Sequence, residues 1–146
     1  MKKTNKIIFL SIAVLVLAIF TVFYSSDINK NVYDVSIYIE GDNANLARVA
    51  DLLVEYDKQD LELVSTSTGG FLDNSSVIKK DGWGMNRALL MSTSADNTKP
   101  ILKLRFKGKD MPKNIRLSNG SVLYLANIGA ATLPSSGVSY RVEYGQ

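Results

Sequence analysis

The feature that most constrains this chain is an uncharged, apolar run, Ile7–Tyr24. As a helix, about 18 residues rise about 27 Å, which is close to the thickness of the hydrocarbon core of a bilayer. Lys2, Lys3 and Lys6 precede the run, and a polar stretch, residues 25–31, follows it. This arrangement predicts one membrane-spanning segment near the start of the chain and a separate domain after it.

We interpret the run as an uncleaved signal anchor. Cleaved signal peptides have a shorter apolar region, of roughly 7–15 residues, and end in small residues, whereas this run ends in the bulky Phe23 and Tyr24. A cleaved signal peptide and a buried core helix are the alternatives, and the second is disfavoured because the run is apolar all round. The side chains expected to lie in the membrane include those of Ile7, Phe9, Leu15, Phe20 and Phe23.

The lysines before the run set the predicted orientation. Because positive residues stay on the cytoplasmic side, residues 1–6 are predicted to be a cytoplasmic basic tail and residues 7–24 the transmembrane segment. Residues 25–31 are predicted to be a linker and residues 32–146 an extracytoplasmic domain. The chain is therefore expected to be a single-pass membrane protein whose C-terminal domain lies outside the cell, at the cell surface.

The net charge of +3 gives no support for nucleic-acid binding. Lys2, Lys3 and Lys6 supply three of the 17 Lys+Arg, so 14 remain against 14 Asp+Glu in the rest of the chain. The lysines and arginine that alternate with other residues over 103–109 are interpreted as the solvated face of a strand. No nucleic acid is expected as a partner.

The chain contains neither cysteine nor histidine. No disulfide framework can stabilise the domain, and the commonest general base and the usual zinc ligand are missing. Asp42, Asn43 and Asn45 lack the spacing of a calcium loop and are interpreted as a turn. Catalysis by two carboxylates in a cleft stays open, but an enzyme is the least favoured class, and no cofactor or metal site is expected.

The pattern of the domain is typical of short strands separated by turns. Apolar and polar residues alternate over residues 35–40, 101–107 and 138–144. The Asn-Gly pair at 119–120 predicts a hairpin turn, and a second hairpin loop is predicted at 81–84. Regularly spaced short strands of this kind indicate an all-β sandwich.

One segment, residues 46–56, is ambiguous on periodicity alone. A helical reading places Leu46, Val49, Ala50 and Leu53 on one face, whereas a strand reading places Ala50, Leu52, Val54 and Tyr56 on one face.

Three stretches resemble the cohesin domain family. Residues 50–64, ADLLVEYDKQDLELV, are similar to a signature near the start of cohesins: an alternating strand, Tyr-Asp, a turn and Leu-Glu-Val. Residues 69–72 resemble the Gly-containing turn of the family, and residues 100–107 resemble one of its later strands. The order and spacing agree across about residues 32–145, and the resemblance assigns the ambiguous segment to a strand.

The resemblance implies an all-β, nine-stranded sandwich of jelly-roll type that performs no chemistry. Cohesins bind dockerins, which are small calcium-loaded helical modules, and in cellulosomes this joins glycoside hydrolases to a scaffold or to the cell surface. The expected partner is therefore a dockerin-type protein module, with a link to polysaccharide degradation.

The resemblance also assigns a partner-binding face. An outward polar pair of the family falls at Val49 and Asp51, with Leu53 and Glu55 on the same face. Val49 replaces the usual Asn, which puts the usual dockerin recognition in doubt. Asp51 is alternatively an ordinary solvent-facing acid. The approximate alignment places Ala95 or Asp96 at a further contact position, which is acidic in many cohesins.

Two other functions stay open. Trp83, between two glycines, is a candidate platform for stacking on a sugar ring in a carbohydrate-binding module, although a core tryptophan beside a turn is favoured. Tyr124, Tyr140 and Tyr144 are expected to pack at sheet edges. The N-terminal helix is also similar to that of pilin-like proteins, although their Gly-Phe-x-x-x-Glu processing site is absent, so a structural surface subunit is the remaining alternative.

Overall fold

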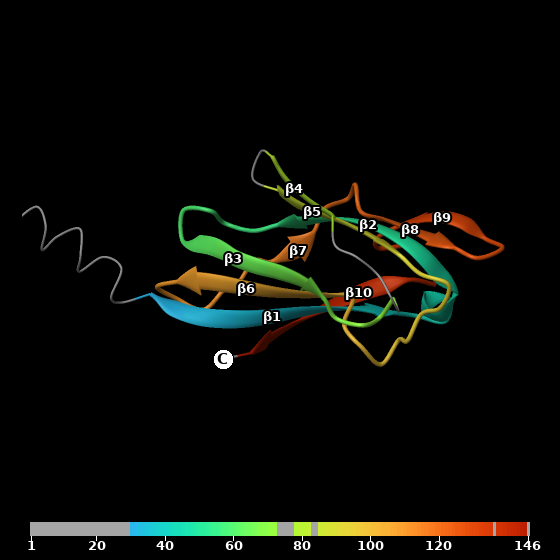
Figure 1. Ribbon diagram of the computed structural model, residues 1–146, viewed down its shortest axis with the longest axis horizontal. Helices are drawn as coiled ribbons and strands as arrows, with labels where there is room; N and C mark the ends of the chain where they lie inside the picture. The colour runs from blue at the N-terminus through green and yellow to red at the C-terminus, as the bar shows by residue number, and fades with distance from the viewer. Residues whose placement is uncertain (1–29, 73–77, 83–84, 136, 146) are drawn as a thin grey trace, which may run out of the picture. The chain divides into compact units, whose positions relative to one another are not determined.

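A computed structural model describes residues 30–72, 78–82, 85–135 and 137–145 (Figure 1). The chain divides into two compact units, Met1–Asn31 and Val32–Gln146. The predicted basic tail, the anchor with Ile7, Phe9, Leu15, Phe20 and Phe23, and most of the linker lie outside the described residues. Within the described ranges, no helix is long and apolar enough to cross a membrane.

The second unit is a sandwich of two antiparallel sheets. Its elements are β1 (Asn31–Glu40), the 3-10 helix η1 (Ala44–Leu46), β2 (Ala47–Glu55), β3 (Leu61–Thr68), β4 (Ile78–Gly82), β5 (Met85–Met91), β6 (Leu102–Gly108), β7 (Arg116–Leu117), β8 (Val122–Leu125), β9 (Gly129–Thr132) and β10 (Ser139–Gly145). Sheet A has the order β10-β1-β6-β3; sheet B has the order β4-β5-β2-β8-β9, and β7 also pairs with β2 (Figure 1). The predicted all-β sandwich is confirmed.

The alternating segments form strands that bury one face. In β1, Val35, Ile37 and Ile39 are buried, and the intervening side chains are half-buried or exposed. β6 buries Leu102, Leu104 and Phe106, and its lysines and arginine point away from the core. Tyr140 and Tyr144 lie on β10, an edge strand, and pack against the core as expected.

The ambiguous segment is a strand, β2, which has β5 on one side and both β7 and β8 on the other. Ala50, Leu52 and Val54 are each 0% exposed. A helix would have buried Leu46, Val49 and Leu53 together, but it would have left the residues that now face the core spread around its circumference. Pairing on both edges supplies the backbone hydrogen bonds that the strand needs.

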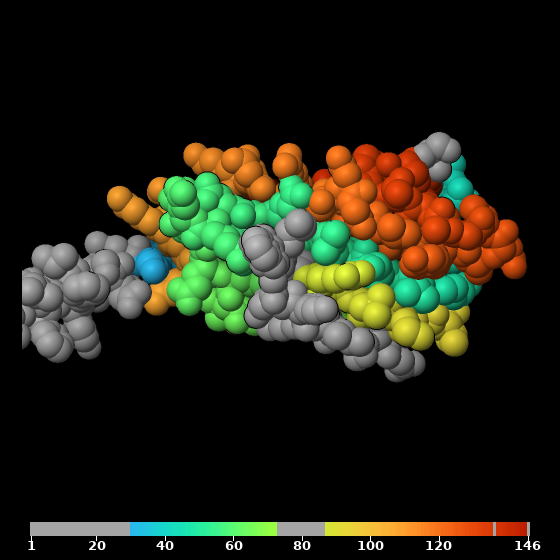
Figure 2. Space-filling model, turned by 90° about the horizontal axis from the view of Figure 1, so that it is seen from above, coloured from blue at the N-terminus to red at the C-terminus, as the bar shows by residue number. Residues whose placement is uncertain are grey.

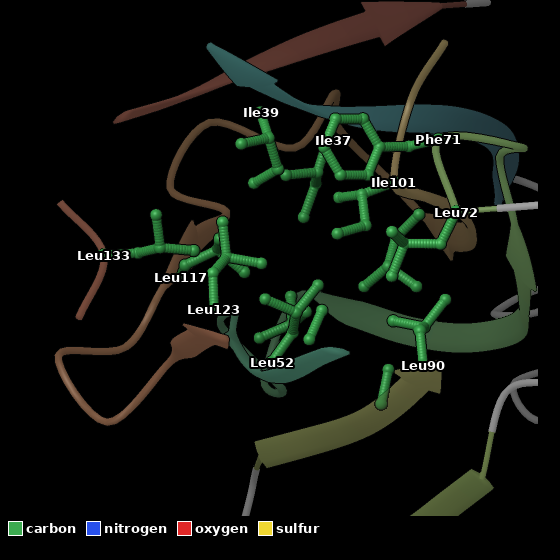
Figure 3. Close-up of a cluster of buried hydrophobic side chains, with 14 of the residues drawn as sticks. Ile37, Ile39, Leu52, Phe71, Leu72, Leu90, Ile101, Leu117, Leu123 and Leu133 are labelled. Carbon is green, nitrogen blue, oxygen red and sulfur yellow. The ribbon is translucent and has the colours of Figure 1, made fainter. Parts of the chain in front are cut away.

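The core is a single apolar layer between the two sheets. Figure 3 shows Ile37 and Ile39 of β1 pointing toward Leu52 of β2 and Leu90 of β5. Connecting segments add further fully buried side chains, which include Phe71, Leu72, Ile101 and Leu133 (Figure 3).

One predicted hairpin is confirmed and the other is wrong. β4 and β5 pair with Gly82 opposite Met85. By contrast, β7 and β8 flank the Asn-Gly pair but do not pair with each other, because both pair antiparallel with β2. Ser118–Ser121 is a turn, closed by a 2.8 Å hydrogen bond from the Ser121 N–H to the Ser118 carbonyl. The turn does not reverse the chain, so β7 and β8 run in the same direction along β2.

The Tyr-Asp element is a folded corner, as the sequence indicates. The backbone N–H of Gln59 donates to the Asp57 carboxylate (2.9 Å), and the Leu61 N–H donates to the Asp57 carbonyl (3.1 Å). The ring of Tyr56 meets that of Phe106 edge to face, with centroids 5.0 Å apart. The corner carries the chain from sheet B to sheet A.

We expect Leu52→Ala to lower the free energy of unfolding by about 2–5 kcal/mol, because it leaves a cavity in the layer between the sheets. Met91→Ala is the control, since Met91 is 62% exposed and its truncation should cost within about 0.5 kcal/mol. Urea unfolding followed by circular dichroism measures both. Equal losses in the two variants would contradict the packing described here.

Candidate functional site

β2 places all four predicted partner-binding residues on the outer face of sheet B. Val49, Asp51, Leu53 and Glu55 alternate with the buried residues of the strand and are each half-buried. This outward placement is set by the period of two along a strand, because successive side chains point to opposite faces.

The neighbouring strands extend this face with apolar side chains. In the β2–β5 pairing, Val49 lies opposite Met91 and Asp51 opposite Leu89. In the β2–β8 pairing, Val49 lies opposite Tyr124 and Asp51 opposite Val122. Directly opposite residues share a face of the sheet, so we call Val49, Leu89, Met91, Val122 and Tyr124 the apolar cluster. Figure 2 shows yellow β5, blue-green β2 and orange β8 side by side on this surface.

The apolar cluster is open to solvent at its two largest members. Met91 is 62% exposed and Tyr124 is 48% exposed. Tyr124 lies on β8, which has β2 on one side and β9 on the other. The expectation that this tyrosine packs at a sheet edge is therefore wrong.

An ion pair lies beside the apolar cluster. The Nε of Arg87 donates to Oδ1 of Asp51 (2.7 Å), and a second guanidinium N–H donates to Oδ2, so the contact is a two-pronged fork. The hydrogen bond that Arg87 donates to Asp51 raises the pKa of Arg87. Because the pair is exposed to solvent, which screens it, it contributes little to stability. Its effect on the face is to balance the charge of Asp51 from within the chain.

Glu55 lies at the far end of β2 and has its own partners. Hydrogen bonds from Ser118 and then from Arg116, whose Nε is 2.7 Å from the carboxylate, lower the pKa of Glu55. Glu55 pairs with β7, whereas Val49 and Asp51 pair with β8. The structure therefore brings Val49 and Asp51 into one patch and sets Glu55 apart at its rim.

The backbone of Leu53 lies between the patch at Val49 and Asp51 and the end of β2 at Glu55. Its N–H donates to the Ser121 hydroxyl (3.0 Å), and its carbonyl accepts from the Ser118 N–H (2.8 Å) and from the Ser121 hydroxyl (3.3 Å). Ser121 is 0% exposed. A Cβ at Gly120 would lie 2.9 Å from Cδ1 of Leu53, so the leucine packs over the turn that replaces the predicted hairpin.

The other predicted contact residues fall elsewhere. Asp96 lies beyond the end of β5 and holds a turn: its Oδ1 accepts from the Thr98 N–H (3.0 Å) and hydroxyl (2.6 Å). These bonds, with that from Lys99, lower its pKa to about 2. Trp83 lies outside the described residues. Among the described residues, no group of three or more His, Cys, Asp or Glu side chains could hold a metal ion.

Sequence reasoning missed most of the apolar cluster. Leu89 and Met91 belong to the run Arg-Ala-Leu-Leu-Met, which contains apolar residues on both faces of β5 and so has no clear alternation. Val122 and Tyr124 follow the Asn-Gly pair, whose predicted hairpin does not place them beside Val49 and Asp51. The available signal for the apolar cluster was a strand that is apolar on both faces. Such a strand is either buried on both sides or has one face that forms an interaction surface.

We expect Ser121→Ala to lower the free energy of unfolding by about 1–3 kcal/mol, because it leaves buried backbone groups of Leu53 with fewer partners. Ser139→Ala, at an exposed position of β10, is the control and should change stability by less than about 0.5 kcal/mol. Urea unfolding compares the two variants. An unchanged midpoint in Ser121→Ala would show that this hydroxyl does not anchor Leu53.

Comparison of this chain with known proteins supports the assignment of its fold. No protein-family model matches the chain, and no curated protein matches it in sequence. The cohesin module of a Clostridium perfringens family 33 glycoside hydrolase has a TM-score of 0.51 at 14% identity, covering 77% of this chain and 95% of that module.

Two further similar structures are also cohesins. A non-cellulosomal cohesin from the archaeon Archaeoglobus fulgidus has a TM-score of 0.49 at 14% identity, covering 66% of this chain and 73% of its own. The sixth cohesin of Acetivibrio cellulolyticus scaffoldin B, solved in complex with a mutant Cel5 dockerin, has a TM-score of 0.49 at 17% identity, covering 66% and 82%. The likeness to the Clostridium perfringens module shows that Val32–Gln146 has the fold of a cohesin module.

Proposed function

We propose that Val32–Gln146 is a non-catalytic binding module that docks a dockerin-type protein on the outer face of sheet B. The observation that carries this proposal is the apolar cluster, which spans β5, β2 and β8 beside the Asp51–Arg87 pair. The choice of a dockerin-type partner follows the cohesin-like residues 50–64 and the cohesin fold.

The composition of this face suits a protein interface. Tyrosine, methionine and arginine are enriched in interface cores, and Tyr124, Met91 and Arg87 supply one of each. Contiguous exposed apolar patches are uncommon on soluble monomers and mark interaction sites. A standard interface buries about 800 Å² on each partner, an area that three adjacent strands of a sheet can provide.

The face also differs from the usual cohesin pattern in a way that affects its partner. Val49 contributes to the apolar cluster where the family has an amide, and Asp51 is already bonded to Arg87. A partner must therefore bury more apolar surface here, and it must place a group beside Asp51 and Arg87 that satisfies both ends of the fork. If binding removed water from Asp51 or Arg87 and left that side chain without a hydrogen-bond partner, the binding free energy would be weakened by about 1–3 kcal/mol or more.

The location of the module is a second part of the proposal. The apolar run of residues 7–24, with lysines before it, supports an anchor that holds the module at the outer surface of a membrane, where it would serve secreted partners that act on polysaccharide. We expect the full chain to stay in the membrane fraction on alkaline carbonate washing, and added protease to cleave the module on intact cells. Release by carbonate would contradict the anchor.

The docking proposal is tested with the full chain in detergent, immobilised and exposed to the secreted and surface proteins of the source organism, with calcium and with a chelator. We expect capture of a protein that carries a duplicated calcium-binding motif, and loss of this capture on chelation. Absence of any calcium-dependent partner would contradict a dockerin-type partner and favour carbohydrate binding or a structural surface role.

The site is tested with Asp51→Lys, which we expect to abolish capture while the circular dichroism spectrum stays unchanged. Asp34→Lys is the matched control, because Asp34 forms the same kind of fork with Arg105, at 2.7 and 3.0 Å, from strands of sheet A. Met91→Ala provides a second variant that removes apolar area without changing charge. Retained affinity in both Asp51→Lys and Met91→Ala would place the partner elsewhere.

A further inference from the structure

A hollow surface lies on the outer face of sheet A, on the opposite side of the sandwich from the apolar cluster. It is a groove of about 420 Å³ across β1, β6 and β3. Its lining residues are Asp34, Val35, Ser36, Ser65, Ser67, Lys103, Leu104 and Arg105. No residue of the apolar cluster takes part in it.

The hollow follows from the sizes of the side chains. In the β3–β6 pairing, Ser65 lies opposite Arg105 and Ser67 opposite Lys103, and β1 supplies Ser36 on the other side of β6. Short serine side chains therefore flank two long cationic ones. Adjacent strands are about 4.8 Å apart, so the three strands give a floor about 10 Å wide that is covered mainly by hydroxyl, ammonium and guanidinium groups.

The groove holds hydrogen-bonding capacity that the chain does not use. A guanidinium has five N–H donors, and the fork to Asp34 occupies two of those of Arg105. In the described part of the chain, Lys103 forms no ion pair within 4.0 Å, and the hydroxyls of Ser65 and Ser67 make no hydrogen bond. The groove can therefore donate to an anion and exchange hydrogen bonds with several hydroxyl groups.

The charge balance of the groove favours an anion. The hydrogen bond from Arg105 holds the pKa of Asp34 below its usual value, so at neutral pH the carboxylate cancels the charge of Arg105. Lys103 also attracts this carboxylate, but two cations, Lys103 and Arg105, line the groove against one acid, so the lining carries one excess positive charge. An anionic group bound there would be held by charge-assisted hydrogen bonds, which are about twice as strong as neutral ones.

Ring stacking has no part in this groove. No aromatic residue lines it, and Tyr38, the next outward residue of β1 beyond Ser36, has the guanidinium of Arg141 over its ring at 4.5 Å from the centroid. A flat apolar sugar face would therefore find no aromatic platform. Hydroxyl groups and one negative charge are the features that this surface can recognise.

We propose that the groove around Lys103, Arg105, Ser65 and Ser67 binds a hydroxyl-rich ligand that carries one carboxylate or phosphate, such as an acidic glycan unit. The anion lies against Lys103 and the free donors of Arg105, and the serines bond to the neighbouring hydroxyls. This site is on the face opposite the docking face, so both can be occupied at once, and neither proposal depends on the other.

The test is an NMR titration of the full chain in detergent with three probes: a galacturonate oligosaccharide, glycerol phosphate and a neutral galactose oligosaccharide. We expect saturable shifts at the amides of Ser65, Ser67 and Lys103 with an anionic probe. Galacturonate alone would identify a carboxylate ligand, and glycerol phosphate alone a phosphate ligand. No saturable shift with either anion, or equal affinity for the neutral probe, would overturn the proposal.

Three variants separate the groove from general surface charge. Lys103→Gln should weaken anion binding about tenfold, whereas Lys107→Gln, on the same strand but outside the groove, should leave it nearly unchanged. Asp34→Asn should strengthen binding, because it removes the carboxylate that competes for Arg105. Equal weakening in both lysine variants, or no gain in Asp34→Asn, would overturn the assignment.

Discussion

The apolar layer between the two sheets is the constraint on which the rest of this domain depends. With no cysteine in the chain, no disulfide can share in holding the sheets together. Most of the strand residues that fill the layer come from β1 and β6 on one side and β2, β5 and β8 on the other, and connecting segments add the rest. Since a slip of one residue would turn every buried side chain of a strand outward, the layer also fixes which side chains each sheet presents to solvent.

β2 shows how one strand serves both the core and the candidate site. Its inward side chains, Ala50, Leu52 and Val54, are fully buried, and its outward ones lie in the middle of the candidate face, the outer face of sheet B. Ser121 and Ser118 bond to the backbone of Leu53, so the chain between β7 and β8 stays beside β2 across a turn. The candidate face is therefore supported by main-chain bonds on both sides, as a flat binding surface requires.

The two outer faces of the sandwich have different chemistry. Each carries an Asp–Arg fork, but the fork of sheet B borders the apolar cluster and that of sheet A lies among serines and Lys103. Apolar area on a flat sheet favours another protein surface. Unused donors in a hollow favour a small polar ligand. Under the two proposals, the module holds a protein on one side and an acidic glycan on the other.

Alternation in the sequence was enough to predict the all-β class and the inward residues of β1, β6 and β10, because it leaves one burial pattern for each strand. The outward set of β2 followed from the resemblance of residues 50–64 to cohesins, since periodicity there also allows a helix. Only the tertiary structure decided which strands lie side by side. Pairing brought Met91 and Tyr124 to Val49, turned the predicted Asn-Gly hairpin into a turn along β2, and placed Ser65 and Ser67 beside Arg105 and Lys103. Local periodicity cannot give these neighbours, because they arise from hydrogen bonds between segments far apart in the chain.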